Sequence, residues 1–245
     1  MAEHASLGPI KQIAAHELVL DQIRRSMDAG QFRPGDRLPA ERDLAEMLDV
    51  SRTTVRAAVA VLEREGRISV RRGRGGGFLV LEPKFDPAEA KRELKRNKLA
   101  VRDAFDFRVV VEGAAARFAA ERRRVADLPK LAELVTRMDE AIEAGRTDTE
   151  STRHVTDFQL LDSAFHLGIA EASGNQQLVD AVARGRSQMW LPVGAIFGHI
   201  EDNANDHHGE ILSAIRDKDG SLAQKTMAEH INETRSTIES WLSSR

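Results

Sequence analysis

Residues 34–56 read PGDRLPAERDLAEMLDVSRTTVR, and this stretch decides the fold of the first part of the chain. Its apolar spacing predicts a helix from about 40 to 48, after which only three residues, 49–51, interrupt the helical pattern. Ser51 can cap the next helix by accepting a backbone N–H, and Gly66 is a typical helix stop. Two helices joined by so short a turn predict a helix-turn-helix.

The segment before this motif predicts another helix, from about 13 to 27. It is followed by a turn at 33–36, where proline presets φ and glycine accepts a positive φ. The apolar residues of all three helices are spaced to cover one face each. The residues expected to face the core are Ile13, Leu18, Leu20, Ile23, Met27, Leu44, Ala45, Leu48, Val55, Val59 and Leu62.

Residues 68–80 have the pattern of a β-hairpin. Apolar and polar residues alternate at both of its ends, as in half-buried strands, and the tip at 71–77 is rich in glycine and arginine. A hairpin in this place is the wing of a winged helix-turn-helix, which we expect to occupy residues 10–81.

The positive charge of the chain is concentrated in this motif. The 245 residues carry a formal net charge of −3, but residues 51–80 hold seven arginines against two glutamates, a local charge of +5. Such asymmetry is typical of a surface that binds a polyanion, although a solvated basic hairpin has the same composition. The arginines are at positions 52, 56, 64, 67, 71, 72 and 74.

A different composition begins after the hairpin. Residues 82–100 form a charged linker with two prolines, in which 87–96 predicts a short helix. From 101 to 243 the apolar spacing is helical and no strand is predicted, so we expect a mainly α protein whose second domain is an antiparallel bundle of six or seven helices. The expected helices cover about 101–122, 127–144, 154–172, 175–190, 191–201, 203–217 and 219–243.

The composition excludes several classes of site. The chain has no cysteine, so disulfides, thiolate metal sites and thiol nucleophiles are impossible. No apolar stretch approaches the roughly 18 residues that span a bilayer, and residues 1–8 lack the pattern of a signal sequence. We therefore expect a soluble, cytoplasmic protein without a membrane partner.

Two parts of the chain resemble known families. Residues 34–45, the run Val50-Ser51-Arg52-Thr53-Thr54-Val55-Arg56 and the glycine-rich wing resemble the DNA-binding signature of the GntR superfamily of bacterial repressors. The second part is similar to the FadR C-terminal (FCD) domain, and the length of its connector at 86–99 favours the seven-helix variety. The motifs that carry this likeness are Phe107-Arg108-xxx-Glu112, Asp162-xx-Phe165-His166, Ser173-Gly174-Asn175, His208-xx-Ile211-Leu212 and Met227-xx-His230.

The resemblance implies a homodimeric regulator, in most cases a repressor, that binds a short palindromic operator in double-stranded DNA and is released by a small carboxylate. Arginine suits this task because its fork matches guanine and phosphate, although these arginines could also merely solvate a helix. The DNA contacts that carry over by motif are Arg42, Ser51, Arg52, Thr53, Thr54 and Arg56, with Arg72, Gly73 and Gly75 in the wing.

A metal site is predicted by the spacing of polar residues in the second part. Asp162 and His166 are four apart, so they share one face of a helix. His208 and His230 lie eleven residues before and after Asp219, and they reach the same height if the last two helices pack antiparallel. The alternative is four unrelated polar residues, but the FCD resemblance supplies all four as ligands.

The ligand set of one carboxylate and three imidazoles suits a divalent cation, with zinc as the first expectation and nickel, manganese or cobalt as alternatives. A carboxylate effector could bind the open metal positions and an arginine together. Arg108 is the first candidate, because an inward arginine on an alanine-rich helix needs a partner, although a salt bridge with Asp162 or another acid would also satisfy it. Arg184 and Arg186 are weaker candidates.

Two other functions stay open at this point. The same cluster of Asp162 and three histidines could activate water in a metallohydrolase, although a hydrolase has no need of a winged helix. The chain could also be a metal-responsive DNA binder without an organic effector. We expect a regulator and not an enzyme.

Overall fold

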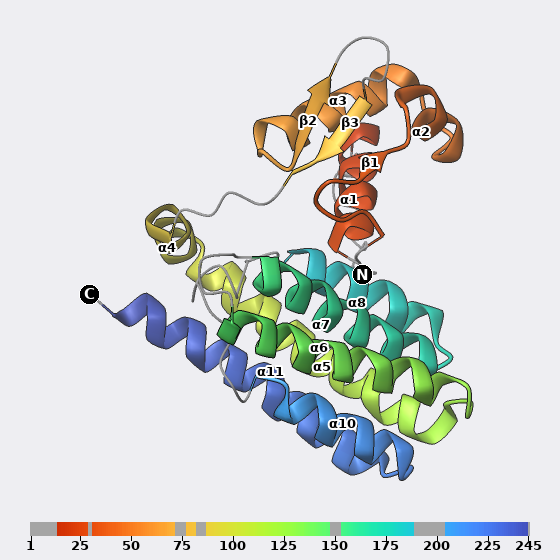
Figure 1. Cartoon of the computed structure of the whole chain (residues 1–245), viewed down its shortest axis with the longest axis vertical. Helices are drawn as coiled ribbons and strands as arrows, with labels where there is room; N and C mark the ends of the chain where they lie inside the picture. The colour runs from red at the N-terminus through yellow and green to blue at the C-terminus, as the bar shows by residue number, and fades with distance from the viewer. Residues whose placement is uncertain are drawn as a thin grey trace, which may run out of the picture. The chain divides into compact units, whose positions relative to one another are not determined.

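The computed structural model describes residues 14–28, 31–71, 77–81, 87–147, 153–188 and 204–244. The chain divides into two compact units, the first made mainly of residues before Lys84 and the second mainly of residues from Lys84 onward (Figure 1).

The first unit has three helices and a small sheet. The chain passes through α1 (Ala15–Asp28), β1 (Arg37–Leu38), α2 (Glu41–Met47), α3 (Arg52–Arg64), β2 (Ile68–Arg71) and β3 (Gly77–Val80). The three strands are antiparallel, in the order β1-β3-β2, and β2 packs against α3 (Figure 1). This is the helix-turn-helix followed by a hairpin that the sequence predicts.

Local chemistry sets the bounds of α3. Ser51 is its N-cap and accepts a hydrogen bond from the backbone N–H of Thr54 at 3.1 Å. At the other end Gly66 adopts φ +69°, which a residue with a side chain rarely does, so the helix stops there as predicted. The inner face of α3 consists of Val55, Ala58, Val59 and Leu62, all buried.

Two features of this unit differ from the sequence-based prediction. Leu18 is 54% exposed and Val19 is buried in its place, because the buried face of α1 runs through Val19, Leu20, Ile23 and Met27. The strand β1 was not predicted, because two residues carry no periodicity. It exists because Arg37 pairs with Leu79 in β3.

The described residues of the second unit form helices joined by turns, and no strand lies among them. Its helices are α4 (Pro87–Arg96), α5 (Lys98–Arg122), α6 (Asp127–Thr147), α7 (Arg153–Ala172), α8 (Gln176–Gln188), α10 (Asp206–Arg216) and α11 (Gly220–Ser243). The short helix α4 is where the sequence predicts it. The helix expected at 191–201 falls outside the described residues, so the choice between six and seven helices stays open.

Helix α5 contacts α7, α8, α10 and α11 within the bundle, and α6 packs on α7 (Figure 1). Buried alanines at 115, 116, 119 and 120 give α5 a smooth surface against which its neighbours pack. Its buried polar side chains, Glu112 and Arg108, lie about one and two turns before this alanine run. Within the described ranges, no helix is both long and apolar enough to cross a bilayer.

Candidate DNA interface and buried metal centre

The N-terminal turn of α3 presents a polar surface to solvent. Ser51, Arg52, Thr53 and Arg56 are exposed there, and Thr54 is half-buried because its hydroxyl lies 2.8 Å from Oγ of Ser51. A helix N-terminus of this kind offers free N–H groups to a phosphate.

The two arginines of this surface share one carboxylate from α2. Nε of Arg52 donates to Oε1 of Glu41 at 2.7 Å, and Arg56 donates from Nε to Oε2 at 2.6 Å and from Nη2 to Oε1 at 3.0 Å. The hydrogen bonds from Arg56 and Arg52 lower the pKa of Glu41, so the carboxylate is charged at neutral pH. Glu41 was not among the predicted site residues.

The other predicted DNA contacts are exposed or outside the described part of the chain. The side chain of Arg42 is 82% exposed, with Nε 3.4 Å from Oδ1 of Asp43. The wing residues Arg72, Gly73 and Gly75 fall in the range 72–76, which the structure does not describe.

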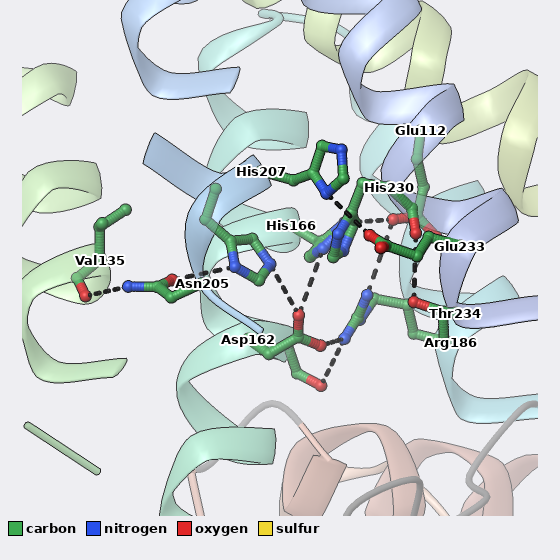
Figure 2. A network of polar contacts seen from close by, with 12 residues as sticks. Glu112, Val135, Asp162, His166, Arg186, Asn205, His207, His230, Glu233 and Thr234 are labelled. Carbon is green, nitrogen blue, oxygen red and sulfur yellow. Dashed lines mark hydrogen bonds and ion pairs between the residues drawn. The ribbon is translucent and has the colours of Figure 1, made fainter. Parts of the chain in front are cut away.

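In the second unit the structure brings together the four residues predicted from spacing. Asp162 and His166 on α7, His208 on α10 and His230 on α11 each offer one ligand atom, and these atoms all lie within 4.8 Å of one another (Figure 2). The rings of His208 and His230 are 4.5 Å apart, as expected for residues at equal distances from the turn that joins α10 and α11. This cluster could hold a metal ion.

Asn205 orients His208. Its amide nitrogen donates to the backbone oxygen of Val135 at 2.8 Å and to Oδ1 of Asp139 at 2.7 Å, both on α6 (Figure 2). The carbonyl oxygen of Asn205 therefore faces Nδ1 of His208, at 3.0 Å, and accepts its proton. This leaves Nε2 of the neutral His208 ring with its lone pair, which points to Oδ1 of Asp162 at 3.0 Å.

His166 has a similar environment. Its Nδ1 contacts Oε2 of Glu112, and its Nε2 lies 3.4 Å from Oδ1 of Asp162. Nε2 of His166 is buried without a hydrogen-bond partner among the described residues. A carboxylate behind a histidine fixes its tautomer and orientation in metal sites.

These contacts fit a cation between the side chains. Ring nitrogens of His166 and His208 both face one oxygen of Asp162, at 3.4 Å and 3.0 Å, so three atoms able to coordinate a cation meet in one place. Nitrogen and oxygen donors of this kind suit a borderline divalent ion.

The protonation states also fit a cation. Burial lowers the pKa of His208, and burial with the charges of His208 and His166 lowers the pKa of His230 well below its usual value. Burial raises the pKa of Asp162, but Arg186 and His166 outweigh it and hold that pKa well below the ordinary range. Neutral imidazoles and an ionised carboxylate are the forms that bind metal.

Two arginines border the cluster, of which Arg108 is buried and Arg186 is half-buried. Nε of Arg108 donates to Oε1 of Glu112 at 2.5 Å, so the predicted effector contact has an acid partner on its own helix. Arg186 on α8 contacts Oδ2 of Asp162 and donates to the hydroxyl of Ser163 at 3.1 Å (Figure 2). Arg184, the other weak candidate, is exposed and lies with its guanidinium carbon 5.9 Å from the centre of the Phe107 ring.

The remaining histidines of the second unit have other polar partners or neighbours, or fall outside the described residues, although the ring of His207 is centred 5.9 Å from that of His230. Nδ1 of His207 bonds to Oε2 of Glu233 at 3.0 Å, so this ring faces a different partner from that of its neighbour His208 (Figure 2). His154 is buried against Gly145, where a Cβ would meet its ring at 2.6 Å. His199 is not in the described part of the chain.

Comparison with known proteins supplies the family. Residues 15–78 match the family of bacterial regulatory proteins named gntR, and residues 103–233 match the FCD domain. The Uxu operon transcriptional regulator of Escherichia coli K12 is 29% identical over 222 residues, which cover 84% of this chain and 80% of that protein. The Glc operon transcriptional activator of the same strain is 27% identical over 228 residues, covering 91% of this chain and 88% of that protein.

The solved structures include a likeness of fold. The structure of E. coli McbR/YncC matches with a TM-score of 0.53 and 22% identity, over 94% of this chain and 99% of that one. That match concerns the fold alone. The two family matches, to residues 15–78 and 103–233, show that the chain belongs to the gntR family of DNA-binding transcriptional regulators and carries an FCD domain.

Proposed function

We propose that this regulator is a homodimeric repressor that binds a short palindromic operator and is released when a small carboxylate binds beside a divalent metal ion in its FCD domain. The observation that carries the proposal is the buried convergence of Asp162, His166, His208 and His230, with two arginines at its border. The proposed DNA-binding part is residues 10–81, the linker is 82–100 and the sensor domain is 101–243.

On the DNA side, α3 lies in the major groove of each half-site. Arg52 and Arg56 recognise base edges, because a guanidinium matches the two acceptors of guanine. The exposed hydroxyls of Ser51 and Thr53, with Thr54, bind phosphate or base edges, and Arg42 binds phosphate. The wing with Arg72, Gly73 and Gly75 lies along the minor groove.

In the bundle, Asp162, His166, His208 and His230 hold the divalent metal, with zinc first and nickel, manganese or cobalt as alternatives. When bound, the ion would supply a Lewis-acid centre for an oxygen ligand. Asn205 and Glu112 keep two of the imidazole rings turned toward it.

Charge balance supports an anionic effector. The carboxylates of Glu112 and Asp162 lie against the guanidinium groups of Arg108 and Arg186, so these four charges cancel. Glu112 and Arg108 are buried, and Asp162 and Arg186 are half-buried. A divalent cation then leaves an excess of positive charge in a place of low dielectric, which an anion would neutralise. We propose Arg108 as the effector contact, with Arg186 as the alternative because it touches Asp162 itself.

The effector half of the proposal is tested by thermal denaturation of the purified chain with a library of organic acids, before and after metal removal. A ligand that binds only the folded state raises the melting temperature. We expect one class of carboxylate to do so, only with metal present, and to release operator DNA at the same concentration. If DNA release followed metal alone, the chain would be a metal-responsive regulator without an organic effector.

The DNA half is tested with operator selected from random duplexes. Arg52→Ala and Arg56→Ala should each reduce operator affinity by about 10-fold or more, because one bidentate base contact is worth ~1–3 kcal/mol and each variant is present twice per dimer. Arg71→Ala should instead weaken binding to every sequence and flatten its salt dependence. Unchanged operator affinity in both Arg52→Ala and Arg56→Ala would contradict the assignment of α3.

A further inference from the structure

Glu41 occupies an unusual place for an acidic residue on a surface that binds DNA. It is the first residue of α2, yet its carboxylate is directed to α3, where both oxygens accept hydrogen bonds from Arg52 and Arg56. Its side chain is 19% exposed, whereas those of the two arginines are 60% and 63% exposed. The carboxylate is therefore covered by the arginines that it holds.

The bonds use one side of each guanidinium. Arg52 donates through Nε, and Arg56 donates through Nε and Nη2. A guanidinium has a second forked edge formed by its two terminal nitrogens, and this end edge points away from a partner bound at the Nε side. Both guanidinium groups thus bond to Glu41 through the Nε edge, and the edge formed by their two terminal nitrogens stays available for a pair of hydrogen-bond acceptors on DNA.

The two arginines are four residues apart on one helix, so without a carboxylate between them their like charges would repel. Each long side chain would also be free to rotate, at a cost in entropy whenever it is fixed on a base. A shared carboxylate removes both costs before DNA arrives. An acidic residue in the first turn of a helix is also stabilised by the helix dipole. That effect does not require the carboxylate to bond to two arginines of another helix, so it does not explain why Glu41 binds both Arg52 and Arg56.

We propose that Glu41 is a specificity-determining positioning residue. It holds Arg52 and Arg56 side by side, as a pair that we call the fork, so that both reach neighbouring acceptors in the major groove. It also lowers the affinity of α3 for phosphate. Its negative charge repels the DNA backbone and offsets part of the charge of the arginines, while the held geometry suits base edges. The proposal rests on the proposed function, since it requires that α3 contacts DNA.

The test uses the full-length chain, a selected operator and a scrambled duplex of equal length, with affinities measured over a series of salt concentrations. Glu41→Gln keeps the size of the side chain but removes its charge. We expect it to bind scrambled DNA more tightly and the operator less tightly, so that the ratio of the two affinities falls by about 10-fold or more. The salt slope on scrambled DNA should become steeper by about one per subunit, because a freed arginine can contact a phosphate.

Glu46→Gln is the matched control. Glu46 is an exposed acid on the same short helix, so its substitution changes the charge equally without touching the fork. It should change both affinities by a similar factor and leave their ratio as in the wild type. A ratio for Glu41→Gln that equals the ratio for Glu46→Gln would overturn the proposal.

Glu41→Asp separates position from charge. Its carboxylate is one methylene shorter and cannot span both arginines, but the charge is kept. We expect weak binding to scrambled DNA as in the wild type, together with a loss of operator affinity. If Glu41→Asp bound the operator as tightly as the wild type does, the proposed positioning role of Glu41 would be wrong, and only the effect of its charge on DNA affinity would remain.

The Nε–H resonances of Arg52 and Arg56 report the fork without DNA, and both should shift in Glu41→Gln but not in Glu46→Gln. Resonances that stay in place would overturn the proposal even in a variant with altered stability. Failure of the wild type to prefer any duplex would instead overturn the proposed function.

Discussion

Glu41 and Glu112 each lie against two arginines, but the first group is at the surface and the second is in the interior. Around Glu41 the arginine side chains are 60% and 63% exposed, and around Glu112 they are 9% and 11% exposed. Water and salt screen the first group, so its contacts add little to stability and can be exchanged for DNA. The second group cannot be solvated, so each charge depends on the others.

The pKa values of the two carboxyl groups show the same difference. Hydrogen bonds from Arg56 and Arg52 lower the pKa of Glu41, with burial a smaller opposing effect. For Glu112, burial is the largest effect and raises its pKa, but Arg108, His166 and Arg186 together reverse the shift. We infer that the surface group serves recognition, whereas the buried group couples the stability of the bundle to what binds there.

The largest expected effect is on stability. Glu112→Ala should destabilise the bundle by about 3–5 kcal/mol, because it removes the acid partner of a buried arginine. Glu41→Ala should leave the unfolding of its own unit nearly unchanged. Urea unfolding of the full-length chain, followed by circular dichroism, measures both. Equal losses in the two variants would mean that burial does not separate the two groups.

The next effect concerns metal. We expect about one divalent ion per chain, and His208→Ala or His230→Ala should lose it together with several degrees of melting temperature, since an ion at ~100 times its dissociation constant stabilises by ~2.7 kcal/mol. His207→Ala is the control, because His207 bonds to Glu233 and should leave the metal in place. Elemental analysis that found no metal, with none taken up on titration, would remove the site.

A smaller effect is expected at Asn205, which touches His208 but is not a proposed ligand. Asn205→Ala should weaken metal binding by about 10- to 100-fold, the usual cost of removing a group that orients a metal-binding histidine. The helices should stay folded, and Asn205→Asp, which keeps an oxygen toward Nδ1 of His208, should recover part of the affinity. Competition with a chelating dye measures the affinity, and equal affinities in all three proteins would refute this role.

Sequence reasoning succeeded where the signal was local. The cap at Ser51, the glycine after α3 and the spacing of four between Asp162 and His166 depend on neighbours within one or two turns. His208 and His230 could be paired because they flank one turn at equal distances. These patterns predict the winged helix-turn-helix and the cluster that could bind metal.

The parts that sequence reasoning missed depend on packing between distant segments. The fork at Glu41 needs α2 to pack on α3, and Arg186 reaches Asp162 only because α8 packs on α7. Asn205 precedes α10 and looks like an N-cap, but its side chain makes no capping bond and reaches α6 instead. For the buried charges, the sequence does contain one local signal, the spacing of four residues between Arg108 and Glu112, which form an ion pair on α5.

The smallest expected effect comes from pH acting on the metal-free protein. The pKa values of His208 and His230 are lowered in the folded state, so above the ordinary histidine pKa of about 6.5 both rings are neutral whether the chain is folded or unfolded. Below that pKa the two histidines are protonated in the unfolded chain but stay neutral in the folded bundle, so the free energy of unfolding falls as pH falls. The lowered pKa values of Glu41, Glu112 and Asp162 act only near or below about pH 4, where carboxyl groups ordinarily titrate.

The interval from pH 7 to pH 5 therefore tests whether these two histidines are held neutral. After treatment with a chelator, we expect the melting temperature of the bundle to fall by a few degrees over this interval, and to fall less in the double variant His208→Gln/His230→Gln. Glutamine cannot be protonated there, so it removes the difference between folded and unfolded states without adding a charge. Two results would show that the two rings are not held neutral: a bundle that became more stable toward pH 5, or a double variant whose melting temperature depends on pH as much as that of the wild type. The contrast between the buried and exposed groups would then rest on the arginines alone.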